Sequence, residues 1–473
     1  MRDRRRSGGD GQVLKALYDR ARALGEGLAS IRTQFQLPGA FSAEVEAAAH
    51  AAARRPISDH IDRTDIPFVT LDPLSSTDLD QAFAIERSGS DLILRYAIAD
   101  VAWFVPTDGP VDIEAWGRGE TIYMPDERLG LYPPVLSEGA ASLLPDAPKP
   151  AIIFVVRVTS DGASSLDGAE RAVVRSGAKL GYATVRAGDL PDGFAELARR
   201  VEAAEQARGA ARVDPPQQQV VEQADGSFSL EFRPVTAAED ANAALSLATN
   251  LAVAEALYRH KTGLFRVMPE PDGWAIQRLR HSARALGVSW PEETSLEERE
   301  RSLDPNDPNE AAFMLAVRRA GTHASYAPYR EGERPWHSAM RATYAHATAP
   351  LRRLADRFVI EAALAVAQGR KVPDAITAAF ERLPEVMNRA DAKAAQVDAA
   401  VLELAEAVVL AGCVGREFKG AVIDIDSRGA KVQIANPAVI TRVGVDGLAI
   451  GQPVKLRLDE VDPSRRLARF SLA

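Results

Sequence analysis

The sequence predicts an α+β protein with three successive parts: a small helical N-terminal segment, a large central domain of mixed helices and strands, and a C-terminal domain of strands alone. Three observations give this prediction. Apolar residues recur with a helical period near the N-terminus, strand patterns and long alanine-rich helices share the middle, and short alternating strands separated by turn residues fill the C-terminal part. A chain of 473 residues is also too long for one hydrophobic core.

The N-terminal segment, residues 1–60, is predicted to be helical. Apolar residues recur at helical spacing from Val13 to Leu28, and a second helix is expected from Ala43 to Arg54 with Ser42 as its N-cap. Two helices here are compatible with a helix-turn-helix contact to nucleic acid. Packing against the next domain is the simpler interpretation, because no residue identifies a recognition helix.

The composition is that of a globular protein, with 46% hydrophobic and 26% charged residues. Every run of 18 residues contains a charge or a polar break, and no apolar segment follows the basic start MRDRRR, so we expect neither a membrane span nor a secretory signal. The single cysteine, Cys413, cannot form an internal disulfide. These features predict a cytoplasmic protein, which we expect to act as a monomer.

The net charge of −9 argues against a generally basic nucleic-acid-binding protein. The charge is unevenly distributed, however. Residues 1–24 hold seven Lys or Arg against three Asp or Glu, and residues 412–473 hold ten against seven. Both termini are therefore basic on an acidic chain, and a channel inside the protein can be basic whatever the total.

Three aspartates follow a short apolar strand that is predicted from Ile66 to Leu71. Asp72 ends the strand, and Asp78 and Asp80 are two residues apart, so in an extended chain they point to the same side. Two carboxylates about 4 Å apart repel by about 4 kcal/mol at an effective dielectric constant near 20, and a hard cation such as Mg²⁺, or Mn²⁺, would offset this. A solvated turn is the alternative interpretation of these acids. A calcium-binding loop of the EF-hand type is disfavoured, because this segment lacks the glycine that such loops contain.

The strands and helix expected next surround these acids. A Ser-Gly-Ser turn predicts a hairpin of Gln81 to Glu86 with Asp91 to Ala99. Further strands are expected at Ala151 to Val158 and Ala172 to Leu180, and a long, mostly apolar helix at Glu239 to Arg259. The alanine content of this helix favours close packing on a sheet.

The segment YAHATAPLRRLADR is a second centre of interest. Pro350 fits the first turn of a helix, which would place Arg352 and Arg353 near the helix N-terminus. Positive side chains are unfavourable there unless an anion binds, and backbone N–H groups with a guanidinium form a phosphate cradle. For Arg353 and Arg357 we favour a surface ion pair with Asp356.

Four motifs carry a resemblance to a known family. VTLDPLSSTDLDQAFAI, YAIADVAWFV, RGETIYMPDERLGLYPPVLSEGAASLLPD and YAHATAPLRRLADR have the order and spacing seen in RNB-domain exoribonucleases of the ribonuclease II/ribonuclease R family, which the chain resembles from Thr64 to Leu410. This implies an RNB catalytic domain at residues 61–411. Such enzymes usually carry two cold-shock domains before it, and we expect a small helical segment in their place here.

The resemblance implies roles for five residues. It makes Asp72, Asp78 and Asp80 the ligands of Mg²⁺, with Asp80 the catalytic acid most sensitive to replacement. It makes Arg352 the arginine that contacts the scissile phosphate and stabilises charge in the transition state. Tyr123 is matched to a tyrosine that stacks on a base near the 3′ end, although packing on the following proline would also explain it.

One position departs from the family pattern, because Gln81 stands where the family usually has a fourth aspartate. An amide oxygen can bind a metal but brings no negative charge. We interpret the site as modified and active. The alternative is a non-catalytic RNA-binding protein with a degenerate metal site, and a nuclease for DNA is a third possibility that shares the metal chemistry.

Residues 412–473 contain five short predicted strands and resemble the S1-type OB domain that ends members of the family. OB folds bind single strands through aromatic and basic residues on one face. We expect RNA contacts from Phe418, Lys419, Arg428 and Lys431, although Phe418 could equally lie in the barrel core. The resemblance as a whole implies a Mg²⁺-dependent, processive 3′-to-5′ exoribonuclease that hydrolyses single-stranded RNA to nucleoside 5′-monophosphates.

Overall fold

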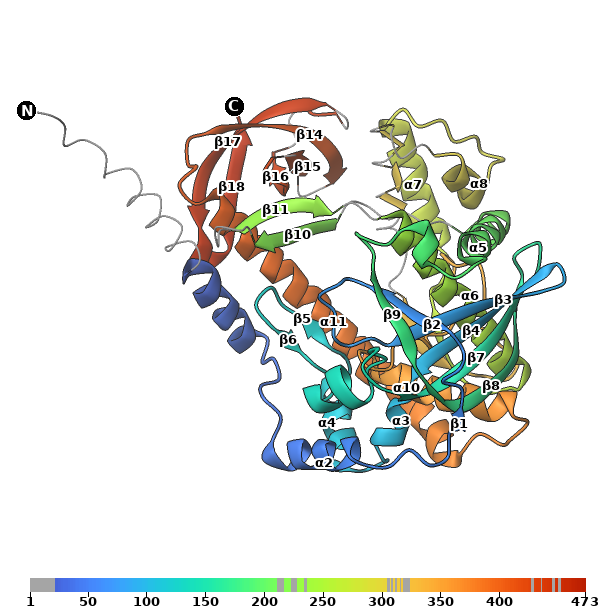
Figure 1. Cartoon of the computed structure of the whole chain (residues 1–473). Coiled ribbons are helices and arrows are strands. Elements are labelled where there is room, and N and C mark those ends of the chain that lie inside the picture. Colours follow the sequence, from blue (N-terminus) through green and yellow to red (C-terminus); the bar gives the residue numbers. More distant parts are fainter. Residues whose placement is uncertain are drawn as a thin grey trace, which may run out of the picture.

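The computed structural model describes residues 22–473, apart from 211–216, 223–227, 234–235, 304–306, 308, 311–312, 315, 318–323, 427–428, 435, 445–446 and 450–451. Figure 1 shows two bodies, a mixed α/β body and a smaller β-barrel. The long helix α11 (Asp374–Leu410) runs from the first to the second. Its 37 residues correspond to about 55 Å at the helical rise. The predicted α+β class with a separate C-terminal barrel is confirmed.

The larger body is built on a mixed seven-stranded sheet in the order β1-β8-β7-β4-β3-β2-β9. The interior strand β7 is buried along most of its length, which agrees with its run of apolar residues. The predicted hairpin forms with tight register, from Gln81 opposite Ile98 to Ser88 opposite Asp91. The strands are β1 (Ile61–Asp62), β2 (Phe68–Asp72), β3 (Gln81–Ser88), β4 (Asp91–Ala99), β7 (Lys149–Val158), β8 (Ser164–Val174) and β9 (Ser176–Gly181).

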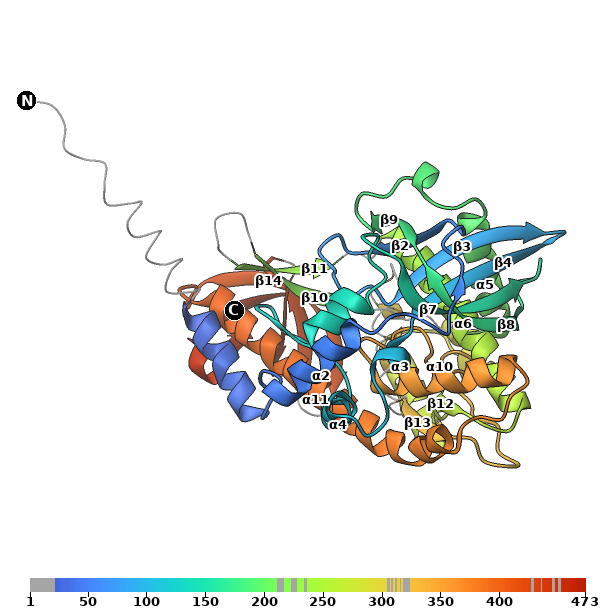
Figure 2. The same ribbon diagram turned by 60° about the horizontal axis from the view of Figure 1, so that its bottom comes forward.

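Helices pack on this sheet, as Figure 2 shows from a second direction. The predicted alanine-rich helix is α6, which packs against β7, β8, α5 and α10. Eleven of its residues are buried, because small side chains allow close approach on several sides. The helices of this body are α3 (Val101–Phe104), α4 (Pro110–Arg118), α5 (Phe194–Arg208), α6 (Ala237–Arg259), α7 (Gly273–Ala285), α8 (Leu296–Arg301) and α10 (Leu354–Ala367).

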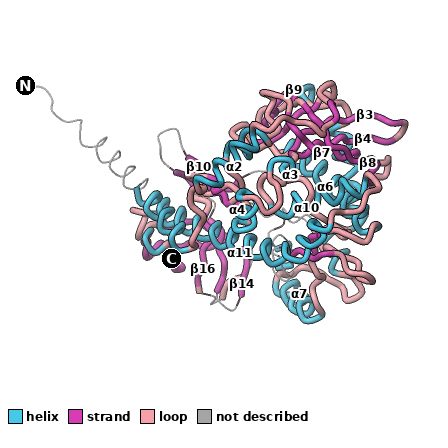
Figure 3. Tube along the Cα trace, turned by 90° about the horizontal axis from the view of Figure 1, so that it is seen from below, coloured by secondary structure: helices cyan, strands magenta, loops and turns pink. Residues whose placement is uncertain are grey.

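Helix α2 (Ala43–Ala53) confirms the second predicted N-terminal helix, and Ser42 caps it by accepting a hydrogen bond from the Val45 N–H at 3.3 Å. Of the first predicted helix, residues 13–21 lie outside the described part of the chain. Residues 22–34 are helical, so this helix continues six residues beyond Leu28. Figure 3 shows this helix beside the C-terminal part of α11.

The C-terminal body has five strands in the order β16-β15-β14-β17-β18, and β16 also contacts β18, so the barrel is nearly closed. A segment of the larger body completes the packing of the barrel. Leu230 of strand β11 (Phe228–Arg233) lies in the barrel's apolar cluster, and its carbonyl accepts a hydrogen bond from the Ala438 N–H at 3.2 Å. The strands are β14 (Glu417–Asp426), β15 (Gly429–Ile434), β16 (Val439–Val443), β17 (Pro453–Asp462) and β18 (Leu467–Leu472).

Three two-stranded sheets complete the described elements: β5 (Ile122–Tyr123) with β6 (Arg128–Leu129), β10 (Gln217–Glu222) with β11 (Phe228–Arg233), and β12 (Leu264–Val267) with β13 (Ser325–Pro328). Among the helices that the structure describes, none has the length and apolar character to cross a membrane.

Candidate active site

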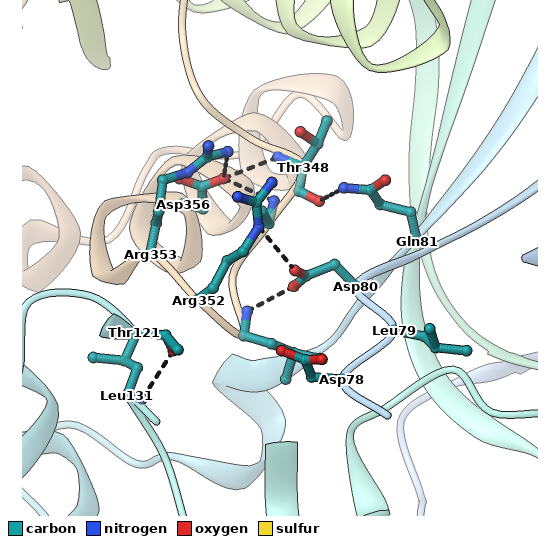
Figure 4. Close-up of polar contacts among 12 residues, drawn as sticks. Asp78, Leu79, Asp80, Gln81, Thr121, Leu131, Thr348, Arg352, Arg353 and Asp356 are labelled. Carbon is teal, nitrogen blue, oxygen red and sulfur yellow. Dashed lines mark hydrogen bonds and ion pairs between the residues drawn. The ribbon is translucent and has the colours of Figure 1, made fainter. Parts of the chain in front are cut away.

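Of the three predicted aspartates, Asp72 ends strand β2, and Asp78 and Asp80 lie on the loop that joins β2 to β3. Lys179 of β9 holds this loop, because its ammonium group donates to the carbonyls of Leu74 at 2.7 Å and Ser76 at 2.5 Å. Leu79 is fully buried, and Figure 4 shows its side chain pointing away from the carboxylates of Asp78 and Asp80. The alternation predicted from the sequence therefore turns these two acids to one side.

Asp80 is buried at the centre of this arrangement. Its Oδ1 accepts a hydrogen bond from the Leu351 N–H at 2.7 Å, and its Oδ2 lies 3.6 Å from Nε of Arg352 (Figure 4). Burial raises the pKa of Asp80 to about 8, although the Arg352 charge and the Leu351 N–H both act to lower it. The acid and the arginine, 272 positions apart in the chain, thus form one site.

Asp72 lies near enough to Asp78 for the Asp78 charge to act on it. Burial raises the pKa of Asp72 to about 7, Arg352 lowers it, and the Asp78 charge raises it further. Asp78 forms an ion pair with Arg128 and accepts a hydrogen bond from the Tyr123 hydroxyl at 3.3 Å. Both partners come from the β5–β6 hairpin, in which Tyr123 and Arg128 are directly opposite each other. Tyr123 is 51% exposed, so its ring is available to a base.

Arg128 is a site residue that the sequence analysis did not identify. It pairs with Glu138 as well as Asp78, and its guanidinium donates to the Thr77 hydroxyl at 3.3 Å. The sequence did contain an indication of this role. Arg128 lies five residues after Tyr123 in the same motif, and residues at that spacing across a short hairpin can face the same neighbour.

Carboxylate oxygens are the ligands that hard divalent cations prefer. A bound cation would also stabilise the ionised forms of Asp72 and Asp80, whose pKa values burial raises. Their side chains do not converge, however. Within the described ranges no group of three or more His, Cys, Asp or Glu residues is close enough to hold a metal ion. Asp78 is directed to Arg128, and Asp80 is directed to the arginine loop, which accounts for this separation.

The loop before α10 presents Arg352, and buried polar side chains hold its backbone. Asp356 accepts hydrogen bonds from the N–H groups of Thr348 at 3.1 Å and Ala349 at 2.8 Å. Asn250 of α6 accepts one from the Ala347 N–H at 2.9 Å. Arg352 itself is 45% exposed, so its guanidinium can reach a ligand as well as Asp80.

The predicted helix start at Pro350 is wrong. Helix α10 begins at Leu354, with Arg353 as the residue before its first turn, so Arg352 lies on a turn and not in the helix. Two pairing predictions also need correction. Arg353 does pair with Asp356, at 2.8 Å, but the pair is buried because Asp356 supports the loop. Arg357 pairs with Asp112 of α4 instead, also in the interior.

Gln81 occupies the first position of β3 and ties this strand to the arginine loop. Its amide nitrogen donates to the Thr348 carbonyl at 2.6 Å (Figure 4), and its amide oxygen accepts from the Tyr96 hydroxyl at 3.0 Å. The same hydroxyl lies 2.8 Å from the Ser246 hydroxyl of α6. A carboxylate could not donate to the Thr348 carbonyl, so glutamine has a structural function here that aspartate cannot supply.

A cavity of about 690 Å³ adjoins the site. Gln81, Thr348 and Arg352 line one part of it, and polar residues of α6, among them Asn242 and Asn250, line another. Amides, hydroxyls and a guanidinium are groups that bind sugar and phosphate oxygens. The cavity is therefore a suitable place for a polar ligand beside the carboxylates.

The residues proposed for RNA contact in the barrel have different surroundings. Lys419 is exposed on β14, and Lys431 is half-buried on β15. Phe418 lies in the barrel core, edge-to-face with Phe470 at a ring distance of 5.9 Å, which is the alternative that the sequence left open. Arg428 lies outside the described residues.

Comparison with known proteins matches each of the two bodies to a protein family model. The family model of the RNB domain matches residues 60–366, and that of the RNase II-type exonuclease C-terminal S1 domain matches residues 416–473. Ribonuclease R of Escherichia coli is 24% identical over 535 aligned positions, which include 100% of this chain and 65% of the relative. Exoribonuclease 2 of Vibrio vulnificus is 36% identical over a shorter stretch, 27% of this chain and 19% of the relative. The chain thus spans just under two thirds of the Escherichia coli protein's length.

Solved structures share the fold at low identity. RNase R of Mycoplasma genitalium in complex with ribose-methylated single-stranded RNA superposes with a TM-score of 0.83 at 19% identity, covering 94% of this chain and 77% of that one. The yeast pseudonuclease Ssd1 superposes with a TM-score of 0.65 at 17% identity, covering 92% of this chain and 54% of that one. The fold therefore occurs both in a nuclease and in a pseudonuclease.

Proposed function

The chain belongs to the RNB-domain family of ribonuclease II/R type, and on this premise we propose that it is a Mg²⁺-dependent 3′-to-5′ exoribonuclease that acts processively on single-stranded RNA and releases nucleoside 5′-monophosphates. The observation that carries the proposal is the contact between Asp80 and Arg352. It combines a buried carboxylate with a half-exposed guanidinium beside a polar cavity, as phosphoryl transfer requires.

In the proposed reaction, Asp72, Asp78 and Asp80 would hold Mg²⁺ through carboxylate oxygens, which requires Asp78 to exchange its ion pair with Arg128 for the ion, and Mn²⁺ is the alternative ion. When bound, the ion would supply charge stabilisation for the attacking and leaving oxygens. Arg352 would bind the scissile phosphate and stabilise the charge that develops on it. Asp80 keeps Arg352 nearby in the ligand-free protein, because its Oδ2 faces the Arg352 Nε.

Tyr123 would stack on a base near the 3′ end, and such a contact contributes about 1 to 3 kcal/mol without depending on sequence. Its hydroxyl is anchored to Asp78, so the ring is held beside the acids. In the barrel, we retain Lys419, Lys431 and Arg428 as proposed contacts to the RNA backbone. Phe418 contributes to the barrel core and is no longer part of this proposal.

The alternative function, RNA binding without cleavage, has the altered acid position as its support, together with the pseudonuclease among the structural neighbours. The surroundings of Gln81 favour the enzyme, because its amide is integrated into the support of the Arg352 loop.

The proposal also covers organisation and location. We propose a helical N-terminal segment (1–60), an RNB catalytic domain (61–411) and an S1-type domain (412–473), in a cytoplasmic monomer. Sedimentation or light scattering of the purified chain would test the monomer, and a dimer would contradict it.

The deciding experiment uses 5′-labelled single-stranded RNA and DNA of the same sequence, with Mg²⁺ or with EDTA. We expect Mg²⁺-dependent conversion of RNA to one short end product, no cleavage of DNA, and no activity in Asp80→Asn. RNA that is bound but stays intact would support the binding protein instead, and equal cleavage of DNA would contradict the specificity for RNA.

A further inference from the structure

The β5–β6 hairpin, which carries Tyr123 and Arg128 to Asp78, has few backbone contacts of its own. Each strand has only two residues, and a two-stranded hairpin of this length is not stable alone. Its position must come from what packs against it. In the described structure, its apolar residues Ile122, Met124 and Leu129 lie in one buried cluster with the helix of residues 22–34 and with α11.

The helix of residues 22–34 packs against α11 at short range. Its buried face is formed by Leu24, Leu28 and Ile31, which have exposures of 3%, 1% and 0%. Gly27 sets the distance to α11, because a Cβ added there would lie 2.4 Å from Leu404 Cδ1 and 3.0 Å from its Cγ. Leu404 is itself fully buried and has little room to move.

Polar contacts extend this packing to the hairpin turn. The Arg32 guanidinium donates to both carboxylate oxygens of Asp126 at 2.7 Å and to Glu127 at 2.5 Å. Arg118 links the segment that follows the helix to the hairpin. Its guanidinium donates to the Gly39 carbonyl at 2.9 Å and to the Gly130 carbonyl at 3.1 Å. The hairpin is thus held at its turn and just after its second strand.

We propose that the helix of residues 22–34 is a positioning element for the active site, which holds the β5–β6 hairpin so that Tyr123 faces the 3′ end of the RNA. Gly27 and Arg32 are its positioning residues. They act through the hairpin and do not touch the substrate. This inference rests on the proposed exoribonuclease function, and it assigns the N-terminal segment a role in catalysis that differs from nucleic-acid recognition.

Gly27→Val and Gly25→Val make a matched pair for the test. Both substitutions put the same β-branched residue into the same helix, so their intrinsic helical costs are equal. At Gly25, an added Cβ has no described heavy atom within 4 Å, whereas at Gly27 it meets Leu404. We expect Gly27→Val to raise KM for single-stranded RNA roughly 5- to 150-fold, the range for one lost base-stacking contact, and Gly25→Val to change it less than about twofold.

A double-mutant cycle with Tyr123→Ala separates positioning from general stability. If the helix acts through Tyr123, Gly27→Val in the Tyr123→Ala background should raise KM by less than about twofold more. Effects of Gly27→Val and Tyr123→Ala that multiply would overturn the proposal, as would an unchanged KM in Gly27→Val. Arg32→Glu offers a second perturbation that spares the core, and adding Asp126→Arg, at the carboxylate that Arg32 holds through two hydrogen bonds, should reverse part of the increase in KM by restoring an ion pair.

Limited proteolysis tests the positioning role of the helix even if the chain does not hydrolyse RNA. Trypsin cleavage after Arg128, followed by mass spectrometry under native conditions, reports release of the hairpin. We expect faster cleavage there in Gly27→Val and Arg32→Glu than in the wild type and Gly25→Val. Equal rates in all four proteins would refute the positioning role, whereas an intact RNA substrate with altered proteolysis would refute only the proposed enzymatic function.

Discussion

Replacing Gln81 by aspartate is expected to lower RNA hydrolysis, although it restores the acid that the family usually has at this position. Aspartate is one methylene shorter and has no N–H group to donate. It would therefore lose the hydrogen bond to the Thr348 carbonyl at 2.6 Å and would reach the Tyr96 hydroxyl poorly. The added charge would also lie next to Asp80 in the sequence, where burial already disfavours a carboxylate.

The size of the effect follows from the burial of the partners. Thr348 is 3% exposed and Tyr96 is fully buried, so water cannot readily replace the lost amide. A buried polar group left without its partner costs about 1 to 3 kcal/mol. Because Thr348 belongs to the loop that presents Arg352, displacement of this loop by about 1 Å would reduce kcat by roughly 100-fold.

Gln81→Glu provides the comparison, since glutamate keeps the length and the acceptor oxygen but loses the donor. We expect kcat to decrease from the wild type to Gln81→Glu and further to Gln81→Asp, when cleavage of labelled RNA is measured over a Mg²⁺ titration. Thermal unfolding should show the same order of stability. An increase in kcat with unchanged stability in Gln81→Asp would refute the reasoning, because Gln81 would then be only a lost metal ligand.

Four other outcomes are expected. Arg352→Lys should retain substrate binding but lose at least about 100-fold in kcat, because lysine has no bidentate guanidinium; unchanged kcat would remove Arg352 from the reaction. EDTA should abolish cleavage and Mg²⁺ should restore it and raise the melting temperature, whereas full activity in EDTA would exclude the proposed ion. Lys419→Ala should reduce the slope of log affinity for single-stranded RNA against log salt concentration by about 0.7, and an unchanged slope would exclude a phosphate contact. Burial, together with Asp391, raises the pKa of Glu120 to about 7, so the protein loses stability as the pH rises from about 4.5 to 7 and this buried side chain ionises. Glu120→Gln should therefore stabilise the protein at pH 8 by at most about 3 kcal/mol and leave its stability unchanged at pH 4. Equal effects on stability at both pH values would contradict this.

Much of the fold could be predicted because it depends on local patterns. The alternation in β3 and β4, the Ser42 cap of α2 and the apolar run of α6 each follow from residues that are close in the sequence. The short strands of the barrel were predictable for the same reason. The prediction of a helix start at Pro350 was wrong, because Asp356 and Asn250 hold the backbone of residues 347–349 in a loop. The helical preferences of neighbouring residues do not reveal these hydrogen bonds.

The site shows the same division between sequence and tertiary structure. The spacing of Asp78 and Asp80 around a buried leucine determined by itself that two carboxylates face one side, because side chains alternate along an extended chain. Only the tertiary structure decided that Arg352 meets Asp80, that Arg128 pairs with Asp78, and that Gln81 supports the Thr348 loop. These contacts join residues up to 272 positions apart, and folding around the common core brings such residues together without any periodic signal in the sequence.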